Sequence, residues 1–484
     1  MLSFIVPVYN KEAYLEKCLK SLAEQSLKDW ELICVLDGPQ AYANDIIRRV
    51  MNKVPNHYKI VEIEHGGACR ARNEGFKHSK GDQVVFWDAD CIIEPDAAKA
   101  WVDIFNDKPE VGFIYSSYKF LDEKGAITAK PFDPWLLRVR NFISGCFPVR
   151  RSLVGQWNED LKSLQDWDFW LGVVDRGGVG KFMLGYAFST AYPDEKSISG
   201  QGCGPDVWLE RVDAVKKLHG LPERDVCVSA IDGEQDGIRL AKLIDADYQD
   251  VPNFKPHRYK TIIQIGFNMD PRQVEVHASI FNQAHIKKIL FWTADNISQI
   301  YNGVSFSAIS KYADLLNAGV TQYVEDLSAK RMMERAGFKV EVLPVPFEAT
   351  GEIKPLPEKP RFAVDICAEY GHVFTALEKS LPDVEIEMLT GAHKIENYTG
   401  LLHFYLDRTM TSSIKRMVLA GRHVISNVQA PFAGYVNDLV APDLFIPEMV
   451  DKIRSLVKKG NNADARDYFQ STLTKDKLLE AIKA

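Results

Sequence analysis

Short apolar runs alternate with segments of helical periodicity along the first third of the chain. In one of the helical segments, Leu15, Cys18, Leu19 and Leu22 recur at positions that share one helix face. The strand-length apolar runs cover residues 3–8, 30–36, 58–64 and 83–87. Strands that alternate with helices pair in parallel, because each crossover helix returns the chain to the same edge. The pattern therefore predicts a doubly wound, mainly parallel α/β sheet.

The same alternation begins again in the second half of the chain. Its expected strands cover residues 261–265, 289–292, 319–324, 340–343, 362–366, 384–389, 401–405 and 424–426. Three prolines, Pro355, Pro357 and Pro360, interrupt this series and mark a connection. We therefore expect a first domain over residues 1–250, a linker at 251–258 and a Rossmann-like α/β region over 259–484. The prolines predict that this region divides into two halves near residues 351–360.

Composition and charge exclude several classes of protein. The 484 residues are 46% hydrophobic and 26% charged, as in soluble globular proteins of more than one domain. A net charge of -7 argues against a generally basic surface for nucleic acid or membrane. We expect no signal peptide and no membrane span, because a basic leader and long apolar runs are missing. The eight cysteines lack CxxC or zinc-type spacing, which predicts reduced, mostly buried thiols in a cytoplasmic protein.

Polar side chains follow three of the expected strands at the point where each strand ends. Asp88 and Asp90 come directly after one apolar run, Asp37 ends another, and Tyr9 follows the first. In doubly wound sheets, ligands bind at the carboxyl ends of strands near a switch in strand order. Two carboxylates at i and i+2 can turn toward one point, which suits a hard divalent cation such as Mn²⁺ or Mg²⁺. The alternative for this acid pair is a solvated turn.

Five segments of this region resemble, in order, the motifs of the family-2 inverting glycosyltransferases of the GT-A fold. They are residues 5–10 (IVPVYN), 35–38 (VLDG), 67–75 (GACRARNEG), 81–90 (GDQVVFWDAD) and 154–171, which ends in QDWDFWL. The resemblance implies a GT-A fold and transfer of a sugar from a nucleotide-diphosphate donor. Leu36, Gln165 and Gly172 depart from the family pattern, which usually has Asp, Glu and Arg at these positions.

The resemblance implies a donor site at these strand ends. Its donor-binding residues are Pro7, Tyr9, Asp37, Arg72 and Asp88, and its metal ligand is Asp90, with Asp88 beside the ribose or the metal. A divalent cation, Mn²⁺ or Mg²⁺, would neutralise the charge that develops on the diphosphate leaving group. Asp37 resembles the residue that reads the nucleobase edge, and the alternative is an aspartate that supports the turn before Gly38. Arg72 is left with two roles, to bind a phosphate or to hold the acid pair.

Inverting transfer also needs a general base, because a hydroxyl must lose its proton as it attacks the anomeric carbon. Asp166 matches the family's catalytic aspartate, and Asp168 is the competing candidate on a different face of the expected helix. Burial beside Trp167, Phe169 and Trp170 would raise the pKa of Asp166. The alternative for Asp166 is an acid that the helix dipole favours at the N-terminus.

The stretch after the base segment departs from the resemblance. Many family-2 relatives carry Tyr-Arg-x-His here, whose His completes the metal site, whereas residues 192–197 read YPDEKS. Asp194 or Glu195 would supply a hard oxygen ligand instead. The glycine-rich stretch at residues 197–204 suits a lid over the donor, and the alternative is a polar loop.

The second half of the chain shows a fainter resemblance, to nucleotide-sugar transferases of the GT-B type. It rests on residues 414–425 (IKRMVLAGRHVI), which resemble that group's helix, glycine and strand near the donor site. Arg416 stands where such enzymes commonly have an acid. Arg416, Arg422 and His423 are therefore left as phosphate ligands or as basic residues at a helix C-terminus. The region would then be a compact GT-B unit, active or degenerate, or an oligomerisation module.

These features together predict a metal-dependent inverting glycosyltransferase with a nucleotide-diphosphate sugar, by preference a UDP-sugar, as donor. The acceptor would offer a hydroxyl on a glycan, a lipid-linked sugar, a protein or a modified nucleobase. Three alternatives stay open: a second active transferase in the C-terminal half, a nucleotidyltransferase, and a non-catalytic scaffold that binds sugar nucleotides. A nucleotidyltransferase would show a glycine-rich phosphate loop after the first strand, and residues 9–12 (YNKE) do not form one.

Overall fold

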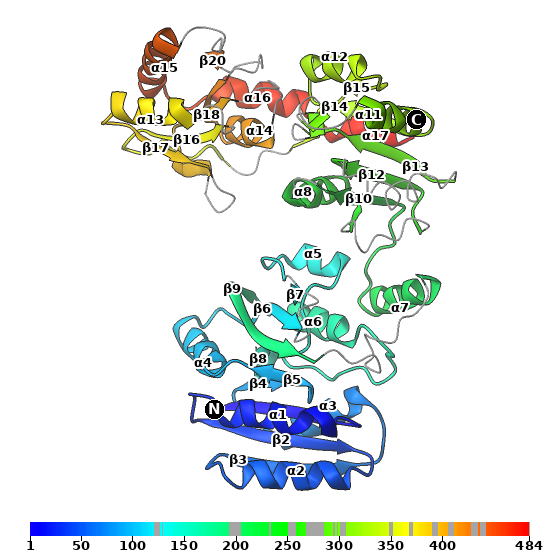
Figure 1. Ribbon diagram of the computed structural model, residues 1–484. Helices are drawn as coiled ribbons and strands as arrows, with labels where there is room; N and C mark the ends of the chain where they lie inside the picture. Colours follow the sequence, from blue (N-terminus) through cyan, green and yellow to red (C-terminus); the bar gives the residue numbers. More distant parts are fainter. Residues whose placement is uncertain are drawn as a thin grey trace. The chain divides into compact units, whose positions relative to one another are not determined.

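The structure is a computed structural model of the chain, and it divides into two compact units, Met1–Glu223 and Arg224–Ala484 (Figure 1). It describes residues 1–120, 126–127, 129–192, 205–231, 234–249, 258–267, 285–293, 296–297, 299–300, 306–347, 352–366, 371–389, 395–404, 411–426, 434–435 and 442–483.

The first unit is built on one nine-stranded sheet in the order β3-β2-β1-β4-β8-β6-β9-β5, with β7 paired to β6. Its strands are β1 (Leu2–Val8), β2 (Trp30–Asp37), β3 (His57–Ile63), β4 (Gln83–Phe86), β5 (Cys91–Ile93), β6 (Phe113–Phe120), β7 (Ala126–Ile127), β8 (Pro148–Arg150) and β9 (Gly180–Ala191). Strands β3, β2, β1 and β4 pair in parallel, as do β6 and β9, and β8 joins the two groups through antiparallel pairs. The expected mainly parallel α/β sheet is confirmed.

The helices of the first unit are labelled in Figure 1. They are α1 (Glu12–Ala23), α2 (Ala41–Met51), α3 (Ala68–His78), α4 (Ala97–Asp107), α5 (Pro134–Val139), α6 (Gln165–Asp175) and α7 (Pro205–Leu218), with a 3₁₀ turn η1 (Arg151–Leu153). Phe4 and Val6 of β1 share a core with α1 and α2. Ile5, between them, faces α3, because successive side chains of a strand point to opposite faces.

Helix α3 lies unusually close to the sheet at Gly75. A Cβ atom on Gly75 would lie 2.4 Å from Cγ2 of Ile5, closer than carbon atoms can approach, and 3.0 Å from Cγ2 of Val35, which is a tight contact. The glycine therefore allows the helix to sit directly on β1 and β2. This close approach determines where Arg72, about one turn earlier in α3, meets the carboxyl ends of these strands.

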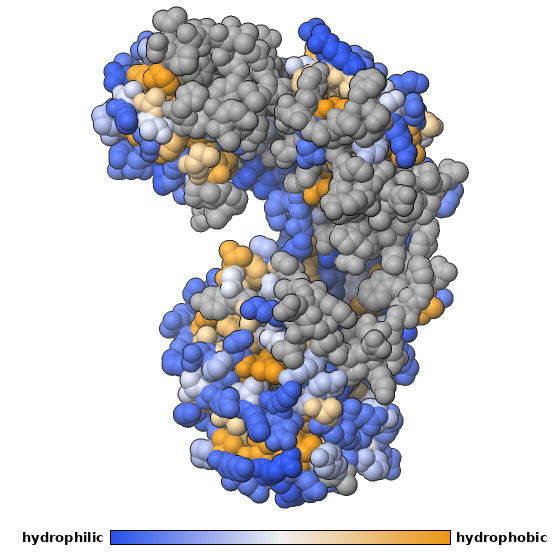
Figure 2. All heavy atoms as spheres, in the orientation of Figure 1, coloured by the Kyte–Doolittle hydropathy of each residue, from blue (hydrophilic) through white to orange (hydrophobic). Residues whose placement is uncertain are grey.

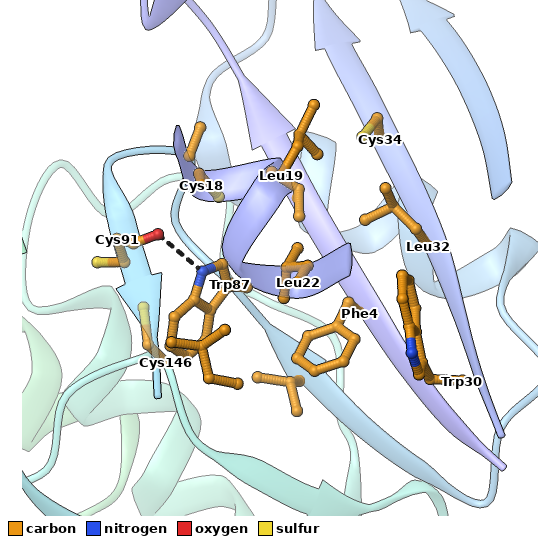
Figure 3. Packing of buried hydrophobic residues seen from close by; sticks show 14 of the residues in the cluster. Phe4, Cys18, Leu19, Leu22, Trp30, Leu32, Cys34, Trp87, Cys91 and Cys146 are labelled. Atoms are coloured by element: carbon orange, nitrogen blue, oxygen red, sulfur yellow. Dashed lines mark hydrogen bonds between the residues drawn. The ribbon is translucent and has the colours of Figure 1, made fainter. Parts of the chain in front are cut away.

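Aromatic side chains anchor the segment that leads to the acid pair. Trp87 is fully buried and makes an edge-on contact with Phe4, with ring centroids 6.4 Å apart. Its indole Nε1 donates to the carbonyl oxygen of Cys91 at 3.2 Å (Figure 3). The residues on both sides of Asp88, Ala89 and Asp90 are thus held in the core, so the acids leave the sheet from a rigid base.

The boundary of the first domain lies earlier than the expected residue 250. Strand β10 (Val226–Ala230) pairs in parallel with β11 (Asp247–Tyr248) on one side and with β12 (Thr261–Ile265) on the other. Residues from Arg224 onward therefore belong to the second unit, because the hydrogen bonds of β10 are made within the second sheet. Of the expected linker at 251–258, residues 251–257 lie outside the described part of the chain.

The second unit contains two separate parallel sheets. The first has the order β11-β10-β12-β13-β14-β15 and the second the order β17-β16-β18-β19-β20. The first sheet has strands β13 (Lys287–Phe291), β14 (Thr321–Val324) and β15 (Glu341–Val342) besides those above, with helices α8 (Glu234–Ile244), α11 (Phe306–Asn317) and α12 (Leu327–Arg335). The connection between the two sheets includes residues 352–360, where the division into halves is expected.

The second of these sheets carries most of the remaining helices. Its elements are β16 (Arg361–Ile366), α13 (Gly371–Ser380), β17 (Glu385–Met388), η5 (Ile395–Asn397), β18 (Gly400–Phe404), α14 (Ser412–Leu419), β19 (His423–Ser426), β20 (Gly434–Tyr435), α15 (Pro442–Val457) and α16 (Ala463–Thr472). Helix α17 (Lys475–Lys483) returns to the first sheet of the unit, where the ammonium of Lys287 donates to the carbonyl oxygens of Ala481 and Ile482.

The surface of the first unit is largely hydrophilic on the face shown in Figure 2, and its hydrophobic residues there form separate groups. Within the described part of the chain, the longest and most apolar helices still fall short of what a bilayer crossing requires.

Candidate active site

The carboxyl ends of β1, β2 and β4 meet at one edge of the sheet of the first unit. Val8 pairs with Leu36, and Ile5 pairs with Phe86, so β4 ends beside the middle of β1. The backbone N–H of Trp87 donates to the carbonyl oxygen of Ile5 at 2.8 Å, which carries the chain toward the end of β1. Pro7 lies within β1, and the residues that follow the three strands share this edge.

Asp88 and Arg72 form an ion pair at this edge. Nη2 of Arg72 lies 3.0 Å from Oδ1 of Asp88. Nη1 donates to Oε1 of Gln165 at 3.4 Å, and the guanidinium lies over the ring of Trp157 at 4.5 Å. Arg72 therefore links the acid pair to the first residue of α6, and of its two expected roles, holding an acid is the one these contacts match.

Asp90 pairs with Lys11, which lies just outside the motif at residues 5–10. Nζ of Lys11 lies 2.7 Å from Oδ2 of Asp90, whose side chain is 15% exposed, against 42% for Asp88. Burial raises the pKa of Asp90, the negative charge of Asp88 raises it further, and Lys11 opposes both. The two acids thus differ, with Asp90 enclosed and Asp88 open to solvent. Lys11 lies three residues after the end of β1, and this position near a strand end is the sequence feature that could have marked it as a site residue.

Asp37 holds the loop before α3 in place. Its carboxylate accepts hydrogen bonds from the backbone N–H of Gly66 at 2.7 Å and of Gly67 at 2.9 Å, and from Nδ1 of His65 at 3.0 Å. The side chain is 2% exposed. Asp37 therefore supports residues 65–67, and not only the turn before Gly38.

An exposed aromatic pair lies beside Asp37. The ring of Tyr9 stacks on the imidazole of His65, with centroids 4.2 Å apart and planes 18° apart. Because Nδ1 of His65 donates to Asp37, the carboxylate fixes the orientation of this pair. His65 lies outside the sequence motifs, and its place two residues before the motif at residues 67–75 is the local signal that could mark it.

Asp166 lies in the first turn of α6 and is enclosed. The residue before the helix, Leu164, has φ 57°, which turns the chain sharply into α6. Oδ1 of Asp166 accepts from the backbone N–H of Trp167 at 2.9 Å. Burial raises the pKa of Asp166, although this hydrogen bond and one with Asn141 work against the rise. The carboxylate thus has the raised pKa expected from its aromatic neighbours.

Asp168, the competing candidate, is occupied by a histidine of α7's C-terminal end. Nε2 of His219 lies 2.9 Å from Oδ1 of Asp168, and Nδ1 lies 3.1 Å from Oδ2 of Asp175. The hydrogen bond to Asp168 raises the pKa of His219, burial opposes the rise, and Asp175 adds to it. An imidazole that donates from both nitrogens is the charged form. No local signal marks His219, because its partners lie far away in the sequence.

The expected third metal ligand and the expected lid lie outside the described residues, since Asp194, Glu195 and residues 197–204 are not among them. The chain reaches this stretch through Tyr192, whose backbone N–H donates to the carbonyl oxygen of Asp90 at 3.0 Å. The ring of Tyr192 packs on Tyr14 of α1, with centroids 5.0 Å apart. Tyr192 therefore lies next to the acid pair.

The basic residues singled out in the second unit have structural partners. Arg422 is buried and donates to the carbonyl oxygens of Lys354, Pro355 and Glu396. Nε2 of His423 lies 2.8 Å from the carbonyl oxygen of Gly460. These contacts match the structural alternative for both residues. Arg416 is partly buried, and burial lowers its pKa.

Comparisons with known proteins find relatives of the N-terminal part of the chain. Residues 3–154 match the model of Glycosyl transferase family 2. The chain is 31% identical over 162 residues to the O-antigen biosynthesis protein RfbC of Myxococcus xanthus, an overlap of 32% of this chain and 13% of that protein. It is 34% identical over 127 residues to the poly(ribitol-phosphate) beta-glucosyltransferase of Bacillus spizizenii, covering 26% of this chain and 20% of that protein.

The solved structure of S. aureus TarS 1-349 in complex with UDP is similar over 45% of this chain and 64% of that chain, with 22% identity and a TM-score of 0.37. The chain spans less than two thirds of the length of each of these proteins. The family match covers β2, which ends in Asp37, and β4, which precedes Asp88 and Asp90. The N-terminal region of this chain is therefore a glycosyltransferase domain of family 2.

Proposed function

We propose that the first unit transfers a sugar from a nucleotide-diphosphate donor to an acceptor hydroxyl, with inversion and with the help of a divalent cation. The observation that carries this proposal is the chain of contacts from Asp88 through Arg72 to Gln165, next to Asp166. It connects the acids proposed for the donor, which lie within the family 2 match at residues 3–154, with the acid proposed for the acceptor, which follows that match.

The nucleoside would lie at the end of β1. Tyr9 and His65 offer an exposed stacked pair on which a nucleobase can pack, and Asp37 lies directly beside them. We assign base recognition to this corner and ribose or diphosphate contacts to Asp88 and Arg72. A uridine nucleotide is the proposed donor, on the resemblance of Asp37 to the base-reading residue of the family.

Asp90 and Asp88 fit a hard cation, Mn²⁺ or Mg²⁺, because both offer carboxylate oxygens and Asp90 is partly desolvated. Such a cation, when bound, neutralises charge on the diphosphate. Lys11 forms an ion pair with Asp90. When Asp90 binds the cation, Lys11 would turn toward a phosphate of the donor. Arg72 keeps Asp88 oriented in both states.

Asp166 would accept the proton of the acceptor hydroxyl. Its carboxylate has a raised pKa from burial and is therefore a better proton acceptor than an ordinary surface aspartate. Asp168 is the weaker candidate because His219 occupies one of its oxygens. The donor-side acids, Asp88 and Asp90, and the proposed base, Asp166, thus come from separate elements. The donor and the acceptor would meet between these elements.

The test uses the full chain with a panel of UDP-, GDP-, CDP- and dTDP-sugars, with and without Mn²⁺, and measures release of the nucleoside diphosphate. We expect release with one class of donor, and only with the cation. Release that does not depend on the cation, or donor binding without release in the presence of candidate acceptors, would overturn the proposal. Asp90→Ala should weaken cation-dependent donor binding, whereas Asp166→Asn should keep it.

The same variants address the second unit in the intact protein. Any release that remains in a chain carrying both Asp90→Ala and Asp166→Asn would have to come from residues 224–484. The partners of Arg422 and His423 support a second unit without a phosphate site at these residues. We therefore expect no remaining release. A cytoplasmic location stays a proposal, supported by free thiols at all six described cysteines.

A further inference from the structure

Two cysteine thiols lie close to the carboxylate of Asp88. Cys91 begins β5, and Cys146 lies between α5 and β8. The two sulfur atoms and one carboxylate oxygen of Asp88 all lie within 4.8 Å of one another. The thiols are buried and hydrogen-bond with each other. Figure 3 shows the two side chains next to each other beside the indole of Trp87.

The distances are close to those of a tetrahedral metal site. With zinc–sulfur bonds of about 2.3 Å and zinc–oxygen bonds of about 2.0–2.2 Å, neighbouring ligands lie about 3.5–3.8 Å apart. The three atoms therefore need to move by no more than about 1 Å, which small side-chain rotations supply. Asp88 is 42% exposed, so a cation and a water molecule as fourth ligand can reach the group from solvent.

Backbone hydrogen bonds hold two of these ligands, Asp88 and Cys91, close together. The N–H of Cys91 donates to the carbonyl oxygen of Asp88 at 3.1 Å, so both residues belong to one turn. Trp87 fixes the carbonyl of Cys91 from the core side. Ligands on an anchored turn lose little conformational freedom when a cation binds. The third ligand, Cys146, is brought in by a distant segment, which explains why sequence spacing does not reveal the group.

We propose that Cys91, Cys146 and Asp88 bind a thiophilic divalent cation such as Zn²⁺. Binding forms two zinc–sulfur bonds and one zinc–oxygen bond, and the two thiol protons pass to solvent. The total charge of the site does not change, because two protons leave as one divalent cation enters. Mn²⁺ and Mg²⁺ prefer oxygen ligands, so this side of Asp88 selects a different ion from the one proposed for Asp90.

Zinc at this site would withdraw Asp88 from the donor. The carboxylate oxygen of Asp88 that binds zinc among the thiols is no longer available to a diphosphate-bound cation. Zn²⁺ is therefore expected to inhibit transfer, and this second part rests on the proposed function. The binding itself does not, because its ligands and its test are independent of any sugar transfer.

The direct test is a titration of the full chain, reduced and free of metal, with Co²⁺. We expect sulfur-to-cobalt charge-transfer absorption that saturates at one equivalent and disappears when Zn²⁺ is added. Cys91→Ser and Cys146→Ser should each remove at least half of this absorption. Cys227→Ala, which changes a buried thiol of the second unit, should leave it unchanged. Absence of the absorption in the wild-type chain would overturn the proposal, as would its survival in both serine variants.

X-ray absorption spectroscopy at the zinc edge, carried out on the wild-type chain, tests the site even if a serine variant fails to fold. With one equivalent of Zn²⁺, two sulfur neighbours at about 2.3 Å are expected, and a shell of oxygen and nitrogen alone would contradict the site. For the inhibition, Zn²⁺ is titrated against transfer in Mn²⁺, and Cys91→Ser should require at least tenfold more Zn²⁺. Equal inhibition of both chains would refute the competition but leave the bound cation established by the cobalt titration.

Discussion

Nη2 of Arg72 lies 3.0 Å from Oδ1 of Asp88. Arg72 is three residues before Gly75, the residue at which α3 packs closely on the sheet. The same guanidinium reaches Gln165, the residue before Asp166. One side chain thus positions an acid of the donor side relative to the helix that carries the proposed base. A planar guanidinium presents separate N–H groups to the two partners in a fixed geometry, whereas an ammonium is a compact charge without that geometry.

Replacing Arg72 by lysine keeps the charge and removes the second hydrogen bond. We expect kcat/KM for sugar transfer to fall about 10- to 100-fold, since hydrogen bonds to charged groups contribute about 1.5–3 kcal/mol. Arg70→Lys, at an exposed position of the same helix, is the matched control and should behave as wild type. Equal kinetics for the two variants would show that the link through Arg72 has no role in transfer.

Substitutions of Asp166 and of Asp168 should have different effects on kcat. Asp166→Asn is expected to lower kcat by about 10²- to 10⁴-fold with unchanged donor affinity, because a general base contributes about that much. Asp168→Asn should lower kcat less than tenfold and lower the thermal midpoint instead, since it breaks the pair with His219. Calorimetry measures donor binding and steady-state assays measure kcat. The reverse order of effects would transfer the role of base to Asp168.

The pH profile of transfer should carry the signature of a base with a raised pKa. Burial raises the pKa of Asp166 above that of an ordinary aspartate. A base must be deprotonated to act, so the rate should be full above the raised pKa and fall as the pH drops through it. The acid limb of kcat should therefore lie above pH ~4, the usual range for aspartate, and a limb that persists unchanged in Asp166→Asn would contradict the assignment.

His219 should make the stability of the first unit depend on pH. Its folded pKa is raised, first by the hydrogen bond to Asp168. The stabilisation is therefore fully present below the unfolded pKa of about 6.5 and is lost as the pH rises through the folded value. We expect about 1 kcal/mol, a modest figure because Asp175 is 39% exposed and solvent screens its charge.

The measurement compares His219→Gln with wild type in urea, followed by tryptophan fluorescence at several pH values. The difference in stability should be largest in mild acid and shrink in alkali. His57→Gln, at an exposed position on β3, serves as the control and should show no such trend. A difference that grows with pH would mean that the imidazole is neutral in the folded protein.

Gly75→Ala should destabilise the first unit by about 1–3 kcal/mol, because the added methyl group overlaps Cγ2 of Ile5. Ile5→Ala removes that atom, so the cost of Gly75→Ala should fall in the Ile5→Ala background. A double-mutant cycle in urea measures this coupling. Additive costs would show that α3 does not rest on β1 at this point.

Most of the fold of the first unit could be predicted from the sequence. The runs at 3–8, 30–36 and 83–87 are strands because buried parallel strands are apolar on both faces and leave a strong local signal. The domain boundary could not be predicted, because β10 looks like any other short strand. Its membership follows from its pairing with β12, which is a contact between distant residues.

Some residues of the candidate site could likewise be predicted from the sequence, and others could not. Asp37, Asp88, Asp90 and Arg72 were selected because each follows a strand or lies in a motif. Lys11 and His65 were missed although they lie close by, since only a side-chain direction distinguishes them from neighbouring polar residues. His219 and Cys146 carry no local signal at all, because their partners are brought to them by other elements.

By itself, the sequence determined the alternation of strands and helices and therefore the edge of the sheet at which polar side chains gather. Periodicity and strand ends are local properties, and local residues are sufficient to specify them. The tertiary structure decided which charges neutralise each other: Lys11 with Asp90, Arg72 with Asp88, His219 with Asp168. It also decided that Asp88 has thiols on one side. These pairings depend on how α1, α3, α6 and α7 pack, and packing joins residues that no sequence spacing connects.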